Sequence, residues 1–419
     1  MDVKISESMS RKRTTHPLSE DPQAVARALV SRLYDEILQE GCVVFVGAGS
    51  TTERRHPRDK TFYDEIKLKA NYPKELPQPS FPQLMQYFCD HLDGGHHNRL
   101  IREAISRIEL FCARGLENRT AMMFSEAAAE IPYLNRFVTT NWDPFLERAL
   151  DVLVPIVQDR DLSFWDDRKR QVLKVHGCIT RPYTLVATQS DYDICVNQNP
   201  LIFNKLKDLM ATKTFLFVGY SMRDADFQEL WNGTVAKLGR FSKRAYAVDH
   251  AATEDAVQFW DQRGIDLFRT TDILVMRALR KRLETDNLIP SEELLDAMRR
   301  AARRISSIHI NMGQETHGKM ASAMYQDGVL HSLEDVITAT ALGTKKSEDF
   351  AHDFAEAERC LRDYRRKRDP VEIAYWSGRF TVIKKFCARS KSPVLPYFHP
   401  YRLRPTKRLI KGERFRSPR

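Results

Sequence analysis

The sequence predicts an α/β protein with a doubly wound parallel sheet and a smaller C-terminal α+β domain. Two observations favour this fold class. Short apolar runs rich in β-branched and aromatic residues alternate with longer segments of helical period. Four of these runs lead directly into glycine or polar residues, as at the carboxyl ends of parallel strands, where open α/β sheets bind ligands. We therefore expect a Rossmann-like sheet.

The individual elements follow from the same patterns. Ala24–Leu38 has apolar residues at helical spacing, and Cys42–Val46 is a continuous apolar run typical of a strand buried on both faces. The region 51–80 is polar and rich in proline, so we expect a loop with one short helix there. Further helices are expected at 81–92, 98–113, 119–129, 224–238 and 253–263. Further strands are expected at 136–138, 172–175, 214–218, 244–248 and 265–268.

The pattern changes near residue 288, where we place a domain boundary. Beyond it, the segments 290–305, 333–340 and 348–362 have helical patterns, whereas the runs 371–376, 381–386 and 394–398 are β-like. We expect four parts in the chain. These are a flexible arm at 1–21, the Rossmann-like domain at 22–287, an α+β assembly or partner domain at 288–399, and a basic tail at 400–419.

The composition is that of a globular protein, with 42% hydrophobic and 29% charged residues in a chain of 419. No apolar run approaches the roughly 20 residues that span a bilayer. Residues 1–22 lack the apolar core of a signal peptide. The 7 cysteines form no C-x-x-C pair, which favours reduced thiols and no structural zinc. We expect a cytoplasmic protein that does not contact membranes.

The positive charge is concentrated at the C-terminal end. Residues 361–419 carry 18 Lys and Arg against 4 Asp and Glu, whereas the net charge of the whole chain is +10. Aromatic residues alternate with the basic ones, a mixture that binds nucleic acid by phosphate contacts and stacking. A solvated tail, or a surface for an acidic partner, explains the same charge. We favour these two explanations over nucleic-acid binding.

Four motifs follow the predicted strands. In chain order they are Gly47-Ala48-Gly49-Ser50, Thr139-Thr140-Asn141-Trp142-Asp143, Lys174-Val175-His176-Gly177 and Gly219-Tyr220-Ser221. Glycine lets a backbone approach a phosphate and loop N–H groups bind it, so we expect the first motif to bind a pyrophosphate, with Gly219 and Ser221 assisting. A tight turn between strand and helix explains the first motif as well, because Thr52 stands where the G-x-G-x-x-G fingerprint has its third glycine.

Three side chains are candidates for chemistry. Asn141 offers both a donor and an acceptor and suits the positioning of a ribose hydroxyl or a water molecule. His176 has the natural side chain for a general base near neutral pH, although a lone histidine is more often structural. Asp143 suits contacts with a ribose or a carboxamide. Capping of the helix expected after Pro144 is the alternative for this carboxylate.

Taken together, residues 24–285 resemble the sirtuin superfamily. The Gly-Ala-Gly-Ser turn resembles its first nucleotide loop, residues 140–143 its Thr-Gln-Asn-x-Asp segment, His176-Gly177 its catalytic His-Gly, and Gly219-Tyr220-Ser221 its Gly-Thr-Ser. Two features of deacetylating members are missing. The interval from Cys178 to Val218 has only two cysteines, too few for the zinc module, and no Gly-Ile-Pro-Asp-Phe-Arg segment follows the first loop.

This variant resembles the bacterial sirtuin-like NAD hydrolases of anti-phage defence. The resemblance implies an NAD glycohydrolase that releases nicotinamide and ADP-ribose, forms a homo-oligomer, and is regulated by a HerA-type ATPase or translocase. His176 and Asn141 would be catalytic, and no metal would be needed. The residues expected to bind NAD are Gly47, Ala48, Gly49, Ser50, Asp143, Gly219 and Ser221. A protein deacylase, and a non-catalytic subunit that binds NAD or ADP-ribose, remain alternatives.

Overall fold

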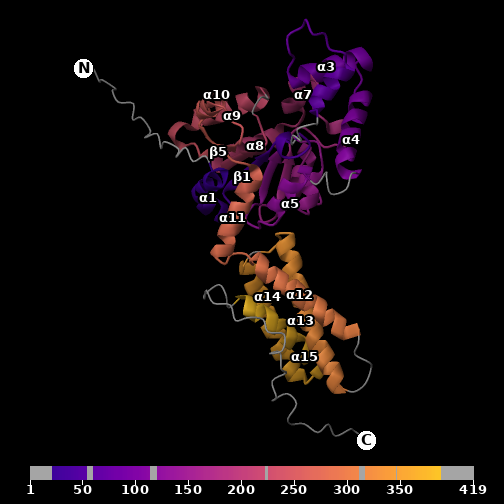
Figure 1. Cartoon of the computed structure of the whole chain (residues 1–419), viewed down its shortest axis with the longest axis vertical. Coiled ribbons are helices and arrows are strands. Elements are labelled where there is room, and N and C mark those ends of the chain that lie inside the picture. The colour runs from indigo at the N-terminus through magenta and orange to yellow at the C-terminus, as the bar shows by residue number, and fades with distance from the viewer. Residues whose placement is uncertain are drawn as a thin grey trace, which may run out of the picture.

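The computed structural model describes residues 21–53, 60–113, 120–221, 225–310, 317–345 and 347–387. A parallel sheet flanked by helices is joined at one end of the long axis by a group of C-terminal helices (Figure 1). The strands are β1 (Cys42–Val46), β2 (Arg136–Thr139), β3 (Gln171–Lys174), β4 (Thr214–Val218), β5 (Ala245–Val248) and β6 (Ile265–Phe268). The helices around the sheet are α1 (Pro22–Leu38), α2 (Phe62–Lys69), α3 (Phe81–Leu92), α4 (Asn98–Ala113), α5 (Met123–Ala129), α6 (Phe145–Ala149), α7 (Gln189–Gln198), α8 (Pro200–Thr212), α9 (Ala225–Leu238), α10 (Glu254–Asp261) and α11 (Asp272–Thr285). The C-terminal helices are α12 (Glu292–Ile310), α13 (His317–Ala341), α14 (Ser347–Lys367) and α15 (Pro370–Cys387).

The sheet has the strand order β3-β2-β1-β4-β5-β6, and all neighbouring strands are parallel. The chain builds outward from β1 in one direction and then returns to build outward in the other. The chain changes direction between the paired strands β1 and β4, so the topological switch point lies at their carboxyl ends. Doubly wound sheets bind their ligands at this point. The predicted doubly wound parallel sheet is therefore confirmed.

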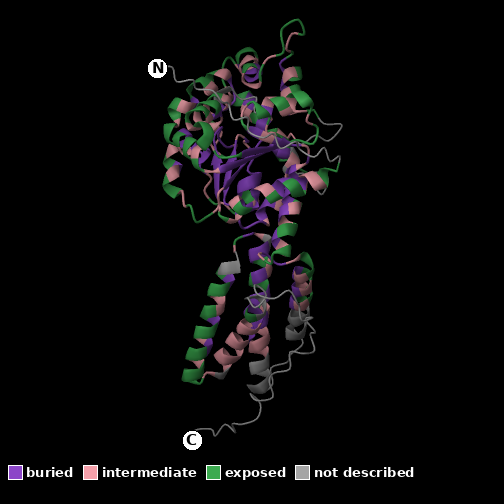
Figure 2. Cartoon of the chain, turned by 90° about the vertical axis from the view of Figure 1, so that its left-hand side faces the viewer, coloured by how far each residue is buried: buried purple, intermediate pink, exposed green. Residues whose placement is uncertain are grey.

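Both faces of the sheet are covered, which is why its strands are continuous apolar runs. Val44 and Val46 of β1 pack in a core with helices α1, α5 and α11. Val43 and Phe45, on the opposite face, pack in a second core with helices α7 to α10. The buried strands lie between these two helical layers in Figure 2.

Helices α2, α3 and α4 form a third cluster of buried residues, which includes Phe62, Leu84 and Leu100. Helix α2 is the short helix expected between residues 51 and 80. Two capping boxes begin these helices, one at Thr61 before α2 and one at Ser80 before α3. Helices α7, α8 and α11 were not named by the sequence analysis.

The C-terminal region is helical, so the prediction of an α+β domain was wrong. Runs 371–376 and 381–386, expected to be β-like, both lie inside α15. Close helix packing is the reason: a Cβ added to Gly378 of α15 would lie 2.1 Å from the Tyr325 carbonyl oxygen of α13. This burial outweighs the β-propensity of the branched side chains. The arm at 1–20, the run 394–398 and the tail at 400–419 lie outside the described residues.

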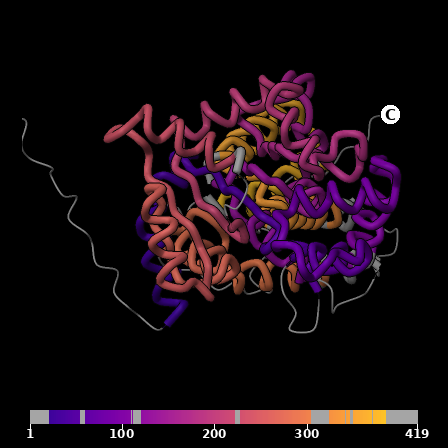
Figure 3. Tube along the Cα trace, turned by 90° about the horizontal axis from the view of Figure 1, so that it is seen from above, coloured from indigo at the N-terminus to yellow at the C-terminus, as the bar shows by residue number. Residues whose placement is uncertain are grey.

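The C-terminal helices have their own buried cluster, which includes Leu295, Leu333 and Val382. Seen from above, they lie behind the sheet and its flanking helices (Figure 3). Arg170, directly before β3, links the two parts: its guanidinium donates to the carbonyl of Leu342 at 2.5 Å and to that of Ala129 at 2.9 Å. Among the described helices, none is both long and apolar enough to cross a membrane.

Candidate functional site

The strand register brings the four motifs to one edge of the sheet. Val46 is in register with both Thr139 and Val218, and Thr139 is in register with Lys174. The segments that follow these four residues therefore emerge side by side at the carboxyl ends of β1, β2, β3 and β4. Two of them, after β1 and β4, flank the switch point.

The glycine loops after β1 and β4 pack directly on each other. The backbone N–H of Gly47 donates to the carbonyl of Val218, and that of Gly49 to the carbonyl of Gly219, both at 2.9 Å. A Cβ added to Gly47 would lie 2.4 Å from the Gly219 oxygen, and one added to Gly219 would lie 2.2 Å from the Ser50 nitrogen. The close packing of the two loops is therefore enough to explain why both positions are glycine. It also engages two N–H groups, those of Gly47 and Gly49, that we expected to bind a pyrophosphate.

Asn141 is joined to the first loop through Thr51. The Asn141 side-chain nitrogen donates to the Thr51 hydroxyl, which donates to the Asp143 carboxylate, each at 2.9 Å. The backbone N–H of Asn141 donates to the Thr139 hydroxyl, which in turn donates to the Val46 carbonyl at 2.7 Å. The turn after β2 is thereby held against the end of β1.

Both carboxylate oxygens of Asp143 have partners within the protein. One accepts from Thr51, and the other accepts from the backbone N–H of Phe145 at 3.1 Å, at the start of α6. This second bond reaches the first residue of α6 from the position before its N-cap, Pro144, so Asp143 binds the start of the helix without being its N-cap residue. Burial raises the pKa of this carboxyl, against the attraction of Lys174 and the hydrogen bonds that lower it.

Lys174 and Glu147 form an ion pair beneath these turns. The Lys174 ammonium lies 2.9 Å from the Glu147 carboxylate and also donates to the main-chain carbonyl of Asp143 at 2.5 Å. Lys174 is completely buried. Burial is the largest single effect and by itself lowers the pKa of Lys174, but the attraction of neighbouring acidic groups, Glu147 first, together with the hydrogen bond to Glu147, outweighs it. The pKa of Lys174 is therefore raised, and the ammonium stays charged.

His176 lies on the turn after β3, next to the turn that carries Asn141. It is 6% exposed, and a ring nitrogen lies 3.3 Å from the hydroxyl of Tyr192 on α7. Its carbonyl accepts from the backbone N–H of Val186 at 3.1 Å. Gly177 has a φ of +84°, and a Cβ there would lie 2.1 Å from the Thr184 oxygen, so the turn itself requires this glycine.

Two buried polar atoms at this edge fit a ligand that supplies hydrogen bonds. Within the described part of the chain, the Asn141 amide oxygen and the Ser50 hydroxyl have no hydrogen-bond partner. Such atoms are costly to bury unless something binds them. Gly49 and Ser221 are exposed beside them. A sugar with its hydroxyl groups and a phosphate suit this set of donors and acceptors.

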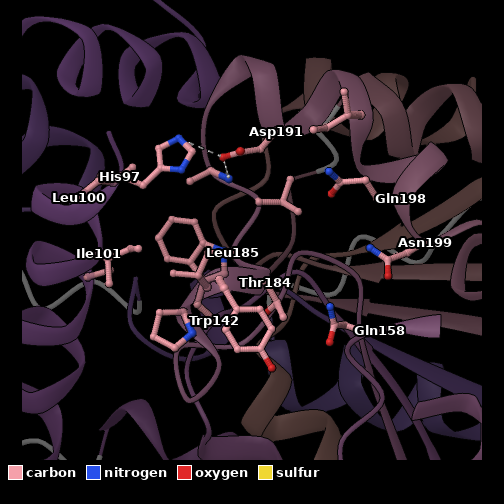
Figure 4. Close-up of a pocket in the computed structure, with 16 residues that line it drawn as sticks. His97, Leu100, Ile101, Trp142, Gln158, Thr184, Leu185, Asp191, Gln198 and Asn199 are labelled. Atoms are coloured by element: carbon pink, nitrogen blue, oxygen red, sulfur yellow. Dashed lines mark hydrogen bonds and ion pairs between the residues drawn. The ribbon is translucent and has the colours of Figure 1, made fainter. Parts of the chain in front are cut away.

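A pocket lies next to the turns that carry Asn141 and His176, because its lining includes Val186, whose backbone N–H donates to the His176 carbonyl (Figure 4). It is formed between α4 and α7 and includes Trp142, which directly follows Asn141. His97 and Asp191 face each other across one end, with the ring nitrogen 3.8 Å from the carboxylate. The amide side chains of Gln158, Gln198 and Asn199 line the other side. The predicted site residues themselves do not line this pocket.

Sequence analysis missed the residues that connect the site: Thr51, Lys174 and Glu147. Lys174 could have been found, because it is a charged residue at the end of a continuous apolar strand, where a charge must have a buried partner. No sequence pattern identified Glu147 as that partner, since the pair spans 27 positions and forms only in the fold.

The two cysteines between His176 and β4 lie in different surroundings. The Cys178 thiol contacts Glu147 and Thr180, and the Cys195 thiol contacts the Tyr192 carbonyl. Across the residues described, no group of three or more His, Cys, Asp or Glu side chains is placed to hold a metal ion.

Comparison with protein families identifies part of the sheet region. Residues 135–268 match the SIR2-like domain. We call them the SIR2-like region. It runs from just before β2 to the end of β6 and contains Asn141, His176 and Gly219, but not the first glycine loop.

Three curated relatives are similar over about half of the chain. They are named NAD(+) hydrolase ThsA and come from Bacillus cereus (strain MSX-D12), Cytobacillus dafuensis and Acinetobacter baumannii (strain 532279). Their identities are 27%, 26% and 23%, over 51%, 52% and 47% of this chain. The matches span 44%, 43% and 40% of the relatives' own length, so the chain spans less than half of each.

Proposed function

We propose that this protein hydrolyses NAD at the bond between nicotinamide and ribose, releasing nicotinamide and ADP-ribose. The observation that carries the proposal is the register of β2 and β3, which sets Asn141 and His176 on adjacent turns at the carboxyl edge of the sheet, on the β1 side of the switch point. The similarity to proteins named NAD(+) hydrolase supports NAD as the substrate.

The proposed reaction passes through an oxocarbenium-like centre, as in glycoside hydrolysis. The nicotinamide leaving group already carries a positive charge in NAD, so the protein's tasks are to fix the ribose, shield it, and direct a nucleophile. The amide oxygen of Asn141 is free among the described residues to accept from a ribose hydroxyl or from water. His176 would take up a proton, with its ring held by Tyr192. General-base assistance of this kind is worth about 100- to 10,000-fold.

Ser50 and Ser221 would bind the phosphates, together with the backbone of Ala48, because the N–H of Gly49 is donated to Gly219. In this proposal Asp143 holds the Asn141 turn through Thr51, and its own contact with the ribose or carboxamide would require its present hydrogen bonds to rearrange. Gly47 and Gly219 set the spacing of the two loops around the phosphates.

The test is NAD consumption by the purified protein, with nicotinamide and ADP-ribose measured by chromatography. We expect His176→Ala and Asn141→Ala to abolish the reaction and to keep the wild-type circular dichroism spectrum. His352→Ala is the matched control, because His352 is exposed on α14. If folded His176→Ala consumes NAD at the wild-type rate, the proposed role of this residue is wrong.

The same assay separates the alternatives. A protein deacylase would consume NAD only with an acylated peptide and would form acyl-ADP-ribose. A non-catalytic subunit would bind NAD without releasing nicotinamide, even with protein in excess over NAD. Free ADP-ribose without added peptide is the outcome that supports hydrolysis.

The proposal extends to regulation, because uncontrolled NAD loss is toxic. We propose a cytoplasmic homo-oligomer that depletes NAD in anti-phage defence, with the C-terminal helices as the surface for assembly or for a HerA-type ATPase. The basic tail would be solvated or contact an acidic partner, with nucleic acid as the alternative. Activity measured with and without such an ATPase and DNA tests these roles. A salt-dependent loss of DNA binding on deletion of residues 400–419 would support a nucleic-acid contact.

A further inference from the structure

The ion pair between Lys174 and Glu147 lies at the centre of the site, although no predicted role includes it. Lys174 ends β3, and its ammonium is fully buried. Glu147 lies on α6 and is 7% exposed. Removing both charges from water costs free energy that their mutual attraction often fails to offset. A gain in stability therefore does not by itself explain why such a pair is present.

The pair is the central link in a chain of hydrogen bonds across three strand ends. On one side the Lys174 ammonium donates to the carbonyl of Asp143, whose carboxylate is tied through Thr51 to the side chain of Asn141. On the other side, Glu147 accepts from the thiol of Cys178 at 3.5 Å, immediately beyond the His176–Gly177 turn.

We propose that Lys174, paired with Glu147, is a positioning residue that sets the Asn141 turn relative to the His176 turn. The inference rests on the proposed NAD hydrolysis for its effect on rate. The structural part of the inference, that Lys174 and Glu147 hold the two turns in place, is independent of NAD hydrolysis.

The geometry explains why a lysine suits this position. A strand in this register needs an apolar side chain for packing, and the stem of lysine provides one. Its terminal ammonium is a compact group with three N–H donors, enough to bind a carboxylate and a main-chain carbonyl at once. A methionine would fill a similar volume but would leave the Asp143 carbonyl without its donor.

The test replaces both charges together. Breaking a buried pair by one substitution leaves an uncompensated charge, whereas replacing both by apolar residues is often neutral for stability. We expect the double variant Lys174→Met/Glu147→Leu to melt within about 4 °C of wild type. We expect its kcat for NAD to fall about 10- to 100-fold while KM changes little, because misplaced groups slow the reaction more than they weaken binding.

The matched control is Arg280→Met/Glu284→Leu. It removes another mostly buried ion pair, with 3.1 Å between its atoms, on α11, where Arg280 also pairs with the partly exposed Glu130 after α5. Its kcat should equal that of wild type. A second measurement, amide hydrogen exchange of residues 139–143, does not depend on activity. Exchange should be faster in the Lys174→Met/Glu147→Leu variant and unchanged in the control.

The outcomes separate the two proposals. If the wild-type protein does not hydrolyse NAD, the proposed function fails, and hydrogen exchange still judges the positioning role. If residues 139–143 exchange no faster in the double variant, Lys174 does not hold this turn and the inference is overturned. A wild-type kcat in a double variant that does exchange faster would overturn the link to catalysis.

Discussion

The contact between the loops after β1 and β4 leads to a prediction about glycine that separates two physical costs. Gly219 has a φ of +58°, and a Cβ there would lie 2.2 Å from the backbone nitrogen of Ser50. Gly219→Ala therefore combines an unfavourable backbone conformation with a steric clash. Two other glycines each carry one of these costs alone, so the three variants form a controlled series.

The magnitudes follow from the geometry of each site. Gly239 has a φ of +54° with no atom within 4 Å of an added Cβ, so Gly239→Ala should cost about 1–2 kcal/mol. Gly47 has an ordinary φ of −102°, but its added Cβ would lie 2.4 Å from the Gly219 oxygen, so Gly47→Ala should cost about 1–3 kcal/mol through overpacking. Gly219→Ala should approach the sum, about 2–5 kcal/mol.

The assay is urea denaturation of each variant, followed by circular dichroism. Gly233→Ala serves as the matched control, because Gly233 lies inside α9 with open space around an added Cβ. Alanine there should be stabilising by about 0.5–1 kcal/mol. If Gly219→Ala lowers the free energy of unfolding no more than Gly239→Ala does, the two loops can move apart at little cost. The argument that their contact requires glycine is then refuted.

Three further predictions concern charged and buried groups. Burial raises the pKa of Glu53 to about 7, so the folded protein binds this proton more tightly than the unfolded chain and loses stability as pH rises through 7. Between pH 6 and pH 8 the wild-type protein should lose about 1 kcal/mol of unfolding free energy, and Glu53→Gln should not show this loss, as urea unfolding would measure. Arg170→Met should cost about 2 kcal/mol and speed amide exchange around Leu342, because the partly buried carbonyls of Leu342, Ala129 and Ile131 lose the guanidinium that donates to them; unchanged exchange there would contradict this role. Burial raises the pKa of Cys42 to about 12, so iodoacetamide at pH 8 should leave Cys42 unmodified while it reacts with the partly exposed Cys360, as peptide mass spectrometry would record.

Much of the sheet region was predictable, because each strand or helix is indicated by the hydrophobic pattern of its own residues. The strand Cys42–Val46 and the helices Phe81–Leu92 and Asn98–Ala113 have the bounds expected from hydrophobic period alone. The strand Ile265–Phe268 was also predicted residue for residue. Local patterns fail where burial by a distant partner decides the conformation, as in α15, whose branched residues favour strand but pack against α13.

The sequence alone determined the order of the strands, most of the helices around them and the polar residues that end each strand, because these depend on neighbours in the chain. It therefore identified Asn141 and His176 as candidates and predicted that they meet at one edge of a parallel sheet. The tertiary structure alone decided which groups hold them. Thr51, Lys174 and Glu147 come from three separate segments. The bond from Asn141 to Thr51 and the bond from Lys174 to Glu147 form only when the strands have aligned. The glycines of the first loop likewise face another loop across the switch point, a contact that a linear pattern does not contain.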